Sequence, residues 1–202
     1  MKIYHAPGTR GIRPIWLCAE LEIPIEVEMI DFAMEWRARP EWRAISPLGK
    51  VPVLVDGDFK MFESEAMMDY ILTKHGNGRL QPEPGTTAHA EYLQWHWYAE
   101  ATFSRPLGEI VNHGREFPGE NRIDAVVEEM QNRAVAAGEM VADHLKDREY
   151  LLGDEFTAAD ISMGYTVMLL ENFVPNRCPE TLSQYWARLK ERPACQKALT
   201  NP

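Results

Sequence analysis

The pattern of apolar and polar positions changes part of the way along the 202-residue chain. The first 75 residues mix two periodicities: alternating positions predict strands, and positions spaced by three and four predict helices. Strands are predicted over 1–6, 23–30, 52–56 and 59–62, and helices over 12–21 and 64–75. After residue 87 only the helical spacing continues, over 88–114, 120–147, 157–172, 180–191 and 193–200. A mixed half followed by a helical half predicts an α+β domain and a separate all-α domain.

The two halves meet in a segment that favours neither helix nor strand. Residues 76–87 contain two prolines and three glycines, which interrupt regular backbone hydrogen bonding. We therefore expect a first domain over 1–76, a linker over 77–87 and an all-helical domain over 88–202.

Two short segments of the first domain carry predictions of their own. Residues 34–45 hold tryptophans and arginines without clear periodicity, and we expect an irregular segment there. Asp56-Gly57-Asp58 lies between the last two predicted strands and predicts a tight hairpin.

The most informative stretch of the chain is Ser46–Val55, where a cluster of turn residues leads into Val51-Pro52-Val53. A proline at the start of an apolar strand cannot donate to the sheet. It makes sense where the backbone turns sharply, through a cis bond, and presents the N–H and C=O of Val51 outward. This segment therefore predicts an exposed peptide edge.

An acid and a hydroxyl, Glu63-Ser64, stand directly before a helical run that contains Met67, Met68 and Ile71. This places Ser64 at the expected N-cap, where free backbone N–H groups attract a carboxylate, while Glu63 can bind an ammonium. A peptide edge next to a clamp for a zwitterion suits a short peptide with an α-amino acid end. The two motifs together point to glutathione.

A second motif lies about 105 residues after Pro52, at Thr157-Ala158-Ala159-Asp160, and predicts a capping box at the start of an apolar helix. With both motifs in place, the whole chain resembles the cytosolic glutathione S-transferases of the bacterial theta-, phi- and beta-like types. The resemblance implies a thioredoxin-like N-terminal domain followed by an all-helical domain, and a homodimer.

The resemblance also implies an enzyme of detoxification. It would activate the glutathione thiolate for attack on an apolar or aromatic electrophile, a peroxide or a disulfide. One alternative is a glutathione-dependent isomerase of the maleylacetoacetate type, whose Ser-Ser-Cys loop this chain lacks. Another is a non-catalytic regulatory protein of the same fold. Such proteins typically lose the glutathione clamp, whereas this chain keeps Val51-Pro52 and Glu63-Ser64.

The resemblance directs attention to the loop after the first strand, because the family activates the thiol there. Thr9 stands where phi-type enzymes carry serine, and Arg10 stands where beta-type enzymes carry cysteine. A hydroxyl donating to the thiolate, or a neighbouring cation, lowers the thiol pKa. Both remain candidates, and backbone N–H groups at Gly11 and Ile12 are a further possibility. Arg13 is expected to be a structural or surface charge.

The remaining expected contacts follow from the chemistry of glutathione. Val51 pairs its backbone with the cysteinyl peptide beside Pro52, and Glu63 with Ser64 binds the γ-glutamyl group. The glycyl carboxylate needs a cation, for which Lys50 and Arg39 are the candidates. An electrophile pocket is expected in the aromatic-rich first helix of the second half, on the face shared by Trp97, Glu100 and Phe103.

Composition narrows the remaining possibilities. The net charge of −10 argues against nucleic acid or an anionic membrane as a partner. No apolar run approaches the roughly 18 residues of a membrane span. Three cysteines without paired spacing indicate neither a disulfide framework nor zinc, and His89 and His96 lack companion ligands, so no metal is expected. The N-terminal residues show no signal-peptide pattern, and a cytoplasmic location is expected.

Overall fold

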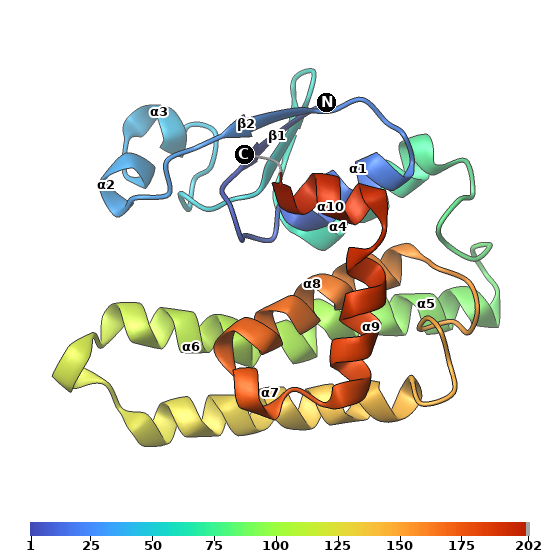
Figure 1. Ribbon diagram of the computed structural model, residues 1–202. Helices are drawn as coiled ribbons and strands as arrows, with labels where there is room; N and C mark the ends of the chain where they lie inside the picture. The colour runs from blue at the N-terminus through green and yellow to red at the C-terminus, as the bar shows by residue number, and fades with distance from the viewer. Residues whose placement is uncertain (201–202) are drawn as a thin grey trace. The chain divides into compact units, whose positions relative to one another are not determined.

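The computed structural model describes residues 1–200 (Figure 1), which divide into two compact units. One unit comprises Met1–Leu80 and the described part of Lys190–Pro202. The other unit comprises Gln81–Leu189. Within residues 1–200, no helix has both the length and the apolar character needed to cross a bilayer.

The first unit is built on a sheet with the strand order β2-β1-β3-β4. The strands are β1 (Lys2–His5), β2 (Glu26–Met29), β3 (Val53–Asp56) and β4 (Phe59–Met61). β1 runs parallel to β2 and antiparallel to β3, which pairs antiparallel with β4. Asp56 pairs with Phe59, so the predicted hairpin is confirmed, with Gly57 at φ +61° in its two-residue loop.

The helices of the first unit follow the predicted apolar spacing. They are α1 (Ile12–Glu20), α4 (Ser64–Ile71), which continues as a π-helical turn over Leu72–Gly76, and α10 (Pro193–Thr200). The β-α-β and β-β-α order of this unit confirms the predicted thioredoxin-like arrangement.

The segment predicted to be irregular contains two short helices, α2 (Met34–Arg37) and α3 (Pro40–Arg43). Pro40 begins α3, where its missing N–H would have no helical partner in any case. The Trp42 side chain is buried with Ala6, Ile30 and Val53 in a core cluster beside the sheet. Trp42 anchors this segment to the core. The segment has too few other buried apolar residues for a helical periodicity to appear in the sequence.

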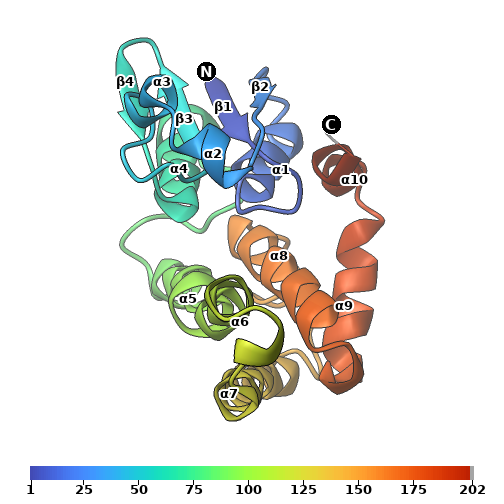
Figure 2. The same cartoon turned by 90° about the vertical axis from the view of Figure 1, so that its left-hand side faces the viewer.

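The C-terminal helix α10 belongs to the first unit, although the sequence pattern groups it with the helical half. α10 lies along α1, as both views show (Figures 1 and 2). Arg192, just before α10, makes two bonds of 2.7 and 2.8 Å to the carboxylate of Glu20. The Trp16 indole N–H donates to the same carboxylate at 2.9 Å. An ion pair and a packed helix face therefore join the two ends of the chain.

The second unit is helical, as predicted. Its α-helices are α5 (Thr87–Trp97), α6 (Arg105–Glu116), α7 (Asp124–His144), α8 (Ala158–Phe173) and α9 (Glu180–Lys190). α8 lies at the centre, and twelve of its sixteen residues are buried. A π-helical segment, Tyr98–Ser104, joins α5 to α6. Pro106 follows it, and the proline ring excludes the ordinary bond to the carbonyl four residues earlier.

The predicted capping box at the start of α8 is confirmed. Asp160 accepts from the Thr157 N–H at 2.8 Å and from the Thr157 hydroxyl at 3.1 Å. Its other oxygen accepts from the Leu151 N–H at 2.9 Å and the Tyr185 hydroxyl at 2.8 Å. Burial raises the pKa of Asp160, and these four donors act in the opposite direction. The carboxyl group thus connects α8, α9 and the loop after α7.

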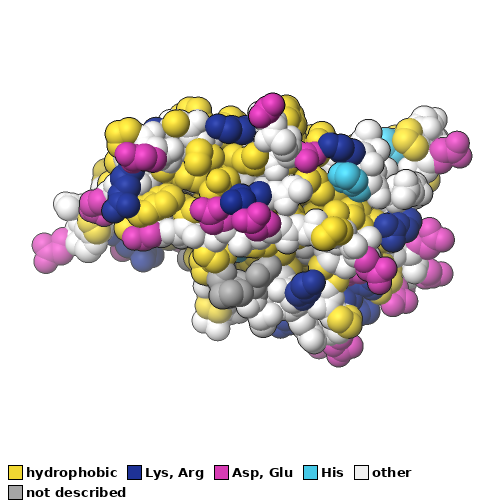
Figure 3. Space-filling view, turned by 90° about the horizontal axis from the view of Figure 1, so that it is seen from above, with side chains coloured by type: hydrophobic (Ala, Val, Ile, Leu, Met, Phe, Trp, Pro, Cys, Tyr) yellow, Lys and Arg dark blue, Asp and Glu magenta, His cyan; other side chains and the backbone are white. Residues whose placement is uncertain are grey.

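Both units leave large apolar side chains exposed, and one face of the molecule shows hydrophobic groups gathered between charged ones (Figure 3). In the first unit these side chains are Phe32, Met34, Leu48, Phe59 and Phe62. In the second unit they are Trp97, Val111, Phe117, Ile123 and Met140.

Candidate functional site

The loop between β1 and α1 holds Thr9 and Arg10, both half-buried. The Thr9 hydroxyl donates to the Ala6 carbonyl at 2.7 Å and lies 3.2 Å from His5 Nδ1. The Ile12 N–H, one of the two expected backbone donors, bonds to the Thr9 carbonyl at 3.1 Å. In this arrangement the Thr9 side chain and backbone both stabilise the turn that leads into α1.

His5 is a residue of this loop region that sequence analysis missed. Its side chain is buried, and burial lowers its pKa to about 4, so the ring is neutral near pH 7. Gly11 makes room for the ring, because a Cβ there would lie 2.3 Å from His5 Nδ1. The strand alternation could have placed His5 on the inward face with Ile3, but it carried no information about Thr9 or Gly11.

The segment before Pro52 is a hydrogen-bonded turn. The Ser46 hydroxyl donates to the Lys50 carbonyl at 2.8 Å and accepts from the Lys50 N–H at 2.9 Å. Gly49 has φ +62°, and a Cβ there would lie 2.8 Å from the Arg37 carbonyl oxygen, so the turn requires glycine. The Val51–Pro52 peptide is cis, as expected.

Val51 itself is half-buried, and its side chain packs on the core cluster around Trp42. Among residues 1–200, no group hydrogen-bonds to its backbone N–H or C=O. This is the open peptide edge that the Val-Pro motif predicts, and it can pair with an extended peptide.

The amino end of α4 carries the predicted acid and hydroxyl, shifted by one position. Glu63, not Ser64, is the N-cap, with φ +67° and an exposed side chain, and its carbonyl accepts the Met67 N–H at 3.0 Å. Ser64 is the first helical residue and is only 3% exposed. The shift arises because Glu63, not Ser64, takes the non-helical backbone conformation.

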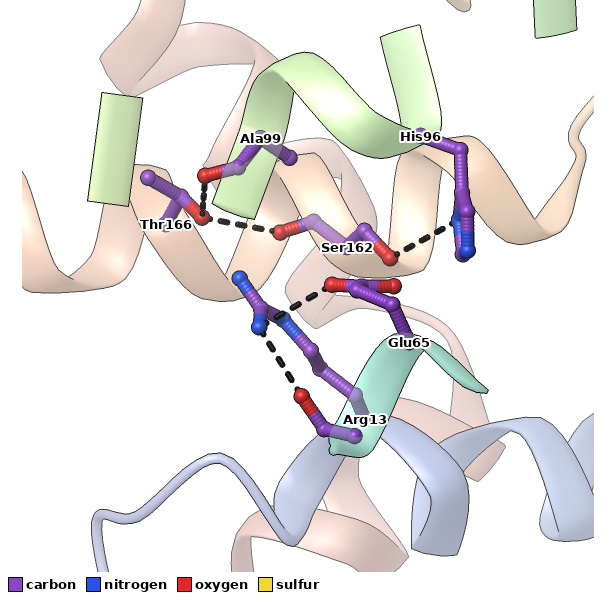
Figure 4. Close-up of polar contacts among 7 residues, drawn as sticks. Arg13, Glu65, His96, Ala99, Ser162 and Thr166 are labelled. Atoms are coloured by element: carbon purple, nitrogen blue, oxygen red, sulfur yellow. Dashed lines mark hydrogen bonds and ion pairs between the residues drawn. The ribbon is translucent and has the colours of Figure 1, made fainter. Parts of the chain in front are cut away.

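Arg13 and Glu65 complete this end of α4 as a buried ion pair (Figure 4). Arg13 Nη1 lies 3.0 Å from Glu65 Oε1 and donates to Ser64 Oγ at 3.1 Å. Of the two expected roles for Arg13, the surface charge is wrong and the structural one is observed. The sequence did hold an indication of this pair, because Arg13 and Glu65 each lie within an apolar helical run. A charge buried in such a run requires a partner of opposite charge.

The two candidate cations for the glycyl carboxylate lie on the surface of the first unit. Lys50 follows the Ser46 turn, and Arg39 caps the start of α3; both side chains are exposed. Arg37, nearby, lies over the Phe32 ring at 4.3 Å. Lys50 directly precedes Val51 in the chain, and both exposed side chains can reorient toward an anion.

The expected pocket wall begins at Trp97, the last residue of α5, and continues with Glu100 and Phe103 on the π-helical segment after it. The wider turn of a π-helix displaces residues that an α-helix would align at spacings of three. Trp97 is 45% exposed, whereas Phe103 is fully buried, with its Cζ 3.3 Å from where a Cβ on Gly138 would lie. Glu100 is half-buried. The three side chains therefore do not share one exposed face.

Buried polar contacts inside the second unit stabilise the same segment (Figure 4). The Thr166 hydroxyl lies 3.1 Å from the Ala99 carbonyl and 3.0 Å from the Ser162 carbonyl. His96 Nδ1 lies 3.2 Å from the Ser162 hydroxyl. His96 is thus a core residue, and residues 1–200 bring together no group of three side chains suited to a metal ion.

Comparison with known proteins identifies the family of the chain. Family models described as glutathione S-transferase, N-terminal domain and C-terminal domain, match residues 1–73 and 124–195. Glutathione S-transferase 4 of Zea mays is 34% identical over 169 residues, covering 79% of this chain and 73% of the maize protein. Glutathione S-transferase 3 of Schizosaccharomyces pombe is 26% identical over 212 residues, covering 97% and 85%.

The fold agrees as well. A crystal structure of a glutathione transferase family member from Pseudomonas fluorescens Pf-5, with two glutathione bound, gives a TM-score of 0.86 at 24% identity. The match covers 100% of this chain and 92% of that chain. From the two domain matches, the maize relative and the shared fold, the chain belongs to the glutathione S-transferase family and is an enzyme of that kind.

Proposed function

We propose that this enzyme binds glutathione on its first unit and transfers the glutathione thiolate to an electrophilic substrate. The observation that carries the proposal is the amino end of α4, where the exposed carboxylate of Glu63 adjoins the buried hydroxyl of Ser64. An acid, a hydroxyl and the first N–H groups of a helix suit the ammonium and carboxylate of a γ-glutamyl group.

The rest of the peptide would be bound along the open edge before Pro52. The unpaired backbone of Val51 supports pairing with the cysteinyl residue. Lys50 or Arg39 would bind the glycyl carboxylate, since both are exposed cations on the same unit. Glutathione is the co-substrate in this proposal, and no step requires a metal.

Thiol activation is assigned to Thr9 or Arg10. Glutathione reacts as its thiolate, and a donor or a cation next to the sulfur favours that form. The Thr9 hydroxyl has a single proton, which the Ala6 carbonyl accepts in this structure. For Thr9 to act, its hydroxyl must rotate toward the sulfur when glutathione binds. Arg10 would act through its charge without such a rotation.

The substrate class is an apolar or aromatic electrophile, with peroxides and disulfides as further acceptors of the thiolate. The aromatic residues of α5 and the following π-helical segment support this choice, and Trp97 and Glu100 are its candidate contacts. Phe103 is retained only as the core side chain beneath them. We further propose a homodimer in the cytoplasm, with a role in detoxification.

The proposal is tested by titrating glutathione into the protein in a calorimeter and by assaying transfer to 1-chloro-2,4-dinitrobenzene. Glu63→Ala should weaken binding by about 1.5–3 kcal/mol, roughly ten- to a hundredfold, the contribution of a charged hydrogen bond. Glu22→Ala is the matched control, because Glu22 is also an exposed glutamate at positive φ in this unit. An unchanged dissociation constant for Glu63→Ala would remove this residue from the site. A protein that binds no glutathione would favour the non-catalytic alternative.

A further inference from the structure

Arg13 reaches the candidate glutathione site from a distant part of the chain. It lies within the buried face of α1, 51 residues before Ser64, and its side chain is completely buried. The single nitrogen Nη1 lies 3.1 Å from Ser64 Oγ and 3.0 Å from Glu65 Oε1 (Figure 4). One guanidinium nitrogen thus contacts two consecutive residues at the start of α4.

The direction of the Ser64 bond follows from chemistry. A guanidinium group has only donors, so the Ser64 oxygen must accept this hydrogen bond. The hydroxyl proton of Ser64 must then point elsewhere. Among residues 1–200, no group accepts that proton, although Ser64 is 97% buried. A serine hydroxyl normally rotates so that it can donate to an acceptor or accept from a donor. Because Arg13 already donates to the Ser64 oxygen, the Ser64 hydroxyl can offer its proton to a ligand.

The charge balance explains why the arginine can occupy this position. A buried guanidinium alone would be costly, and Glu65, only 1% exposed, neutralises it. The pair therefore adds little net charge to the site. The main effect of Arg13 on the site is therefore on the Ser64 hydroxyl, which its hydrogen bond orients and polarises.

We propose that Arg13 is a positioning residue that fixes the Ser64 hydroxyl as the hydrogen-bond donor to the α-carboxylate of the γ-glutamyl group. The inference rests on the proposed function and adds a specificity: the site distinguishes a γ-glutamyl group from an acyl group of the same length without that carboxylate. Arg13 does not touch the ligand in this scheme and acts only through Ser64.

The test compares glutathione with 4-aminobutyryl-cysteinylglycine, which lacks only that α-carboxylate. Because Arg13→Met alone would leave Glu65 buried without its partner, the variant used is the pair Arg13→Met/Glu65→Met, in which the ion pair is replaced by apolar groups. The control pair is Arg192→Met/Glu20→Met, which removes the other ion pair of α1 without touching α4. Dissociation constants are measured by calorimetry on folded protein.

The variant pair should bind glutathione about tenfold more weakly and bind the analogue as the parent does. In a Ser64→Ala background the same pair should cause no further loss for either compound, and the control pair should leave both affinities unchanged. Equal weakening of both compounds would assign Arg13 a merely structural role and overturn the inference. Unchanged glutathione affinity would also overturn it. A parent protein that binds neither compound would overturn the proposed function and the inference with it.

Discussion

At the scale of single residues, the protons in the β1–α1 loop limit which side chain can activate the thiol. Thr9 donates its only hydroxyl proton to the Ala6 carbonyl, and His5 Nδ1 lies 3.2 Å from the Thr9 hydroxyl oxygen. The Ile12 N–H is bonded to the Thr9 carbonyl. A bound thiolate must therefore displace one of these bonds, accept from the backbone N–H of Gly11, or rely on the charge of Arg10.

Two substitutions separate these possibilities. If Thr9 donates to the thiolate, Thr9→Ala should raise the pKa of bound glutathione and reduce turnover by roughly ten- to a hundredfold at neutral pH, as expected for one lost hydrogen bond. Thr9→Ser should retain most activity because the hydroxyl remains. The measurements are thiolate absorbance against pH and turnover of 1-chloro-2,4-dinitrobenzene.

If Arg10 acts instead, Arg10→Ala should cause that loss. Thr9→Ala should then cost only the stability of the turn, about 1 kcal/mol. Parent-like titration and turnover in both variants would exclude both side chains as activators.

His5 makes the stability of the protein depend on pH. Its pKa is about 4 in the folded protein and about 6.5 when exposed, so the unfolded chain binds the proton more readily between these values. The contribution of neutral His5 to the free energy of unfolding is therefore complete above pH 6.5 and is lost as the pH falls toward 4. Between pH 7.5 and pH 5 the parent should lose about 2 kcal/mol of unfolding free energy through this residue.

Urea unfolding of the parent and of His5→Gln at both pH values measures this contribution. The variant should be less stable at pH 7.5 but should lose about 2 kcal/mol less on acidification. The same pH dependence in both proteins would contradict a buried neutral His5.

At the scale of elements, the starts of two helices show what a sequence pattern can and cannot predict. The capping box of α8 was predicted from Thr157 and Asp160 alone, because all its defining bonds lie within four residues. The start of α4 was displaced by one residue, because the positive φ of Glu63 is not encoded by residue type. Local chemistry is visible in the sequence, whereas a tertiary backbone conformation is not.

The π-helical segment Tyr98–Ser104 is a second example of that limit. Helical periodicity predicted the long helix but assumed spacings of three and four throughout. The bond between the Thr166 hydroxyl and the Ala99 carbonyl lies in this segment and joins residues 67 positions apart, so helical spacing does not show it. The candidate pocket wall was therefore the least predictable part of the site, and Val51 with Glu63 and Ser64 the most predictable in position.

Asp160 should contribute more to stability than any exposed acid of the second unit. Asp160→Ala removes the acceptor of four buried or partly buried donors, each of which costs about 1 kcal/mol or more when unsatisfied. We expect a loss of about 4 kcal/mol or more in unfolding free energy. Asp154→Ala, an exposed aspartate six residues earlier, should change stability by less than about 0.5 kcal/mol. Equal small effects in the two variants, measured by thermal or urea unfolding, would show that the box is dispensable.

At the scale of the whole molecule, the exposed apolar side chains are the main evidence for self-association. Leu48 and Met34 are 73% and 63% exposed, and further aromatic and aliphatic groups are uncovered on both units. Such groups favour burial between subunits. In analytical ultracentrifugation at micromolar concentration, we expect a particle of twice the 23.2 kDa chain mass. A single 23.2 kDa species would contradict the proposed homodimer.

The assignment of the chain to two units was predictable except at its end. The linker residues and the change of periodicity predicted a linker over 77–87, and the first unit of the structure ends at Leu80. The return of α10 to α1 was not predictable, because Arg192 and Glu20 are 172 residues apart and a single ion pair leaves no periodic pattern. Contacts of this range are set by tertiary packing alone.

The junction of α10 with α1 constrains how the protein is made on the ribosome. Synthesis proceeds from the N-terminus, so the sheet and α1 emerge long before Arg192 and α10 are translated. Until Arg192 and α10 have left the ribosome, one side of α1, including the carboxylate of Glu20, lacks its final covering. The first unit is thus begun first but completed only after the second unit has been translated, and a nascent chain stalled between α9 and α10 would hold an unfinished first unit.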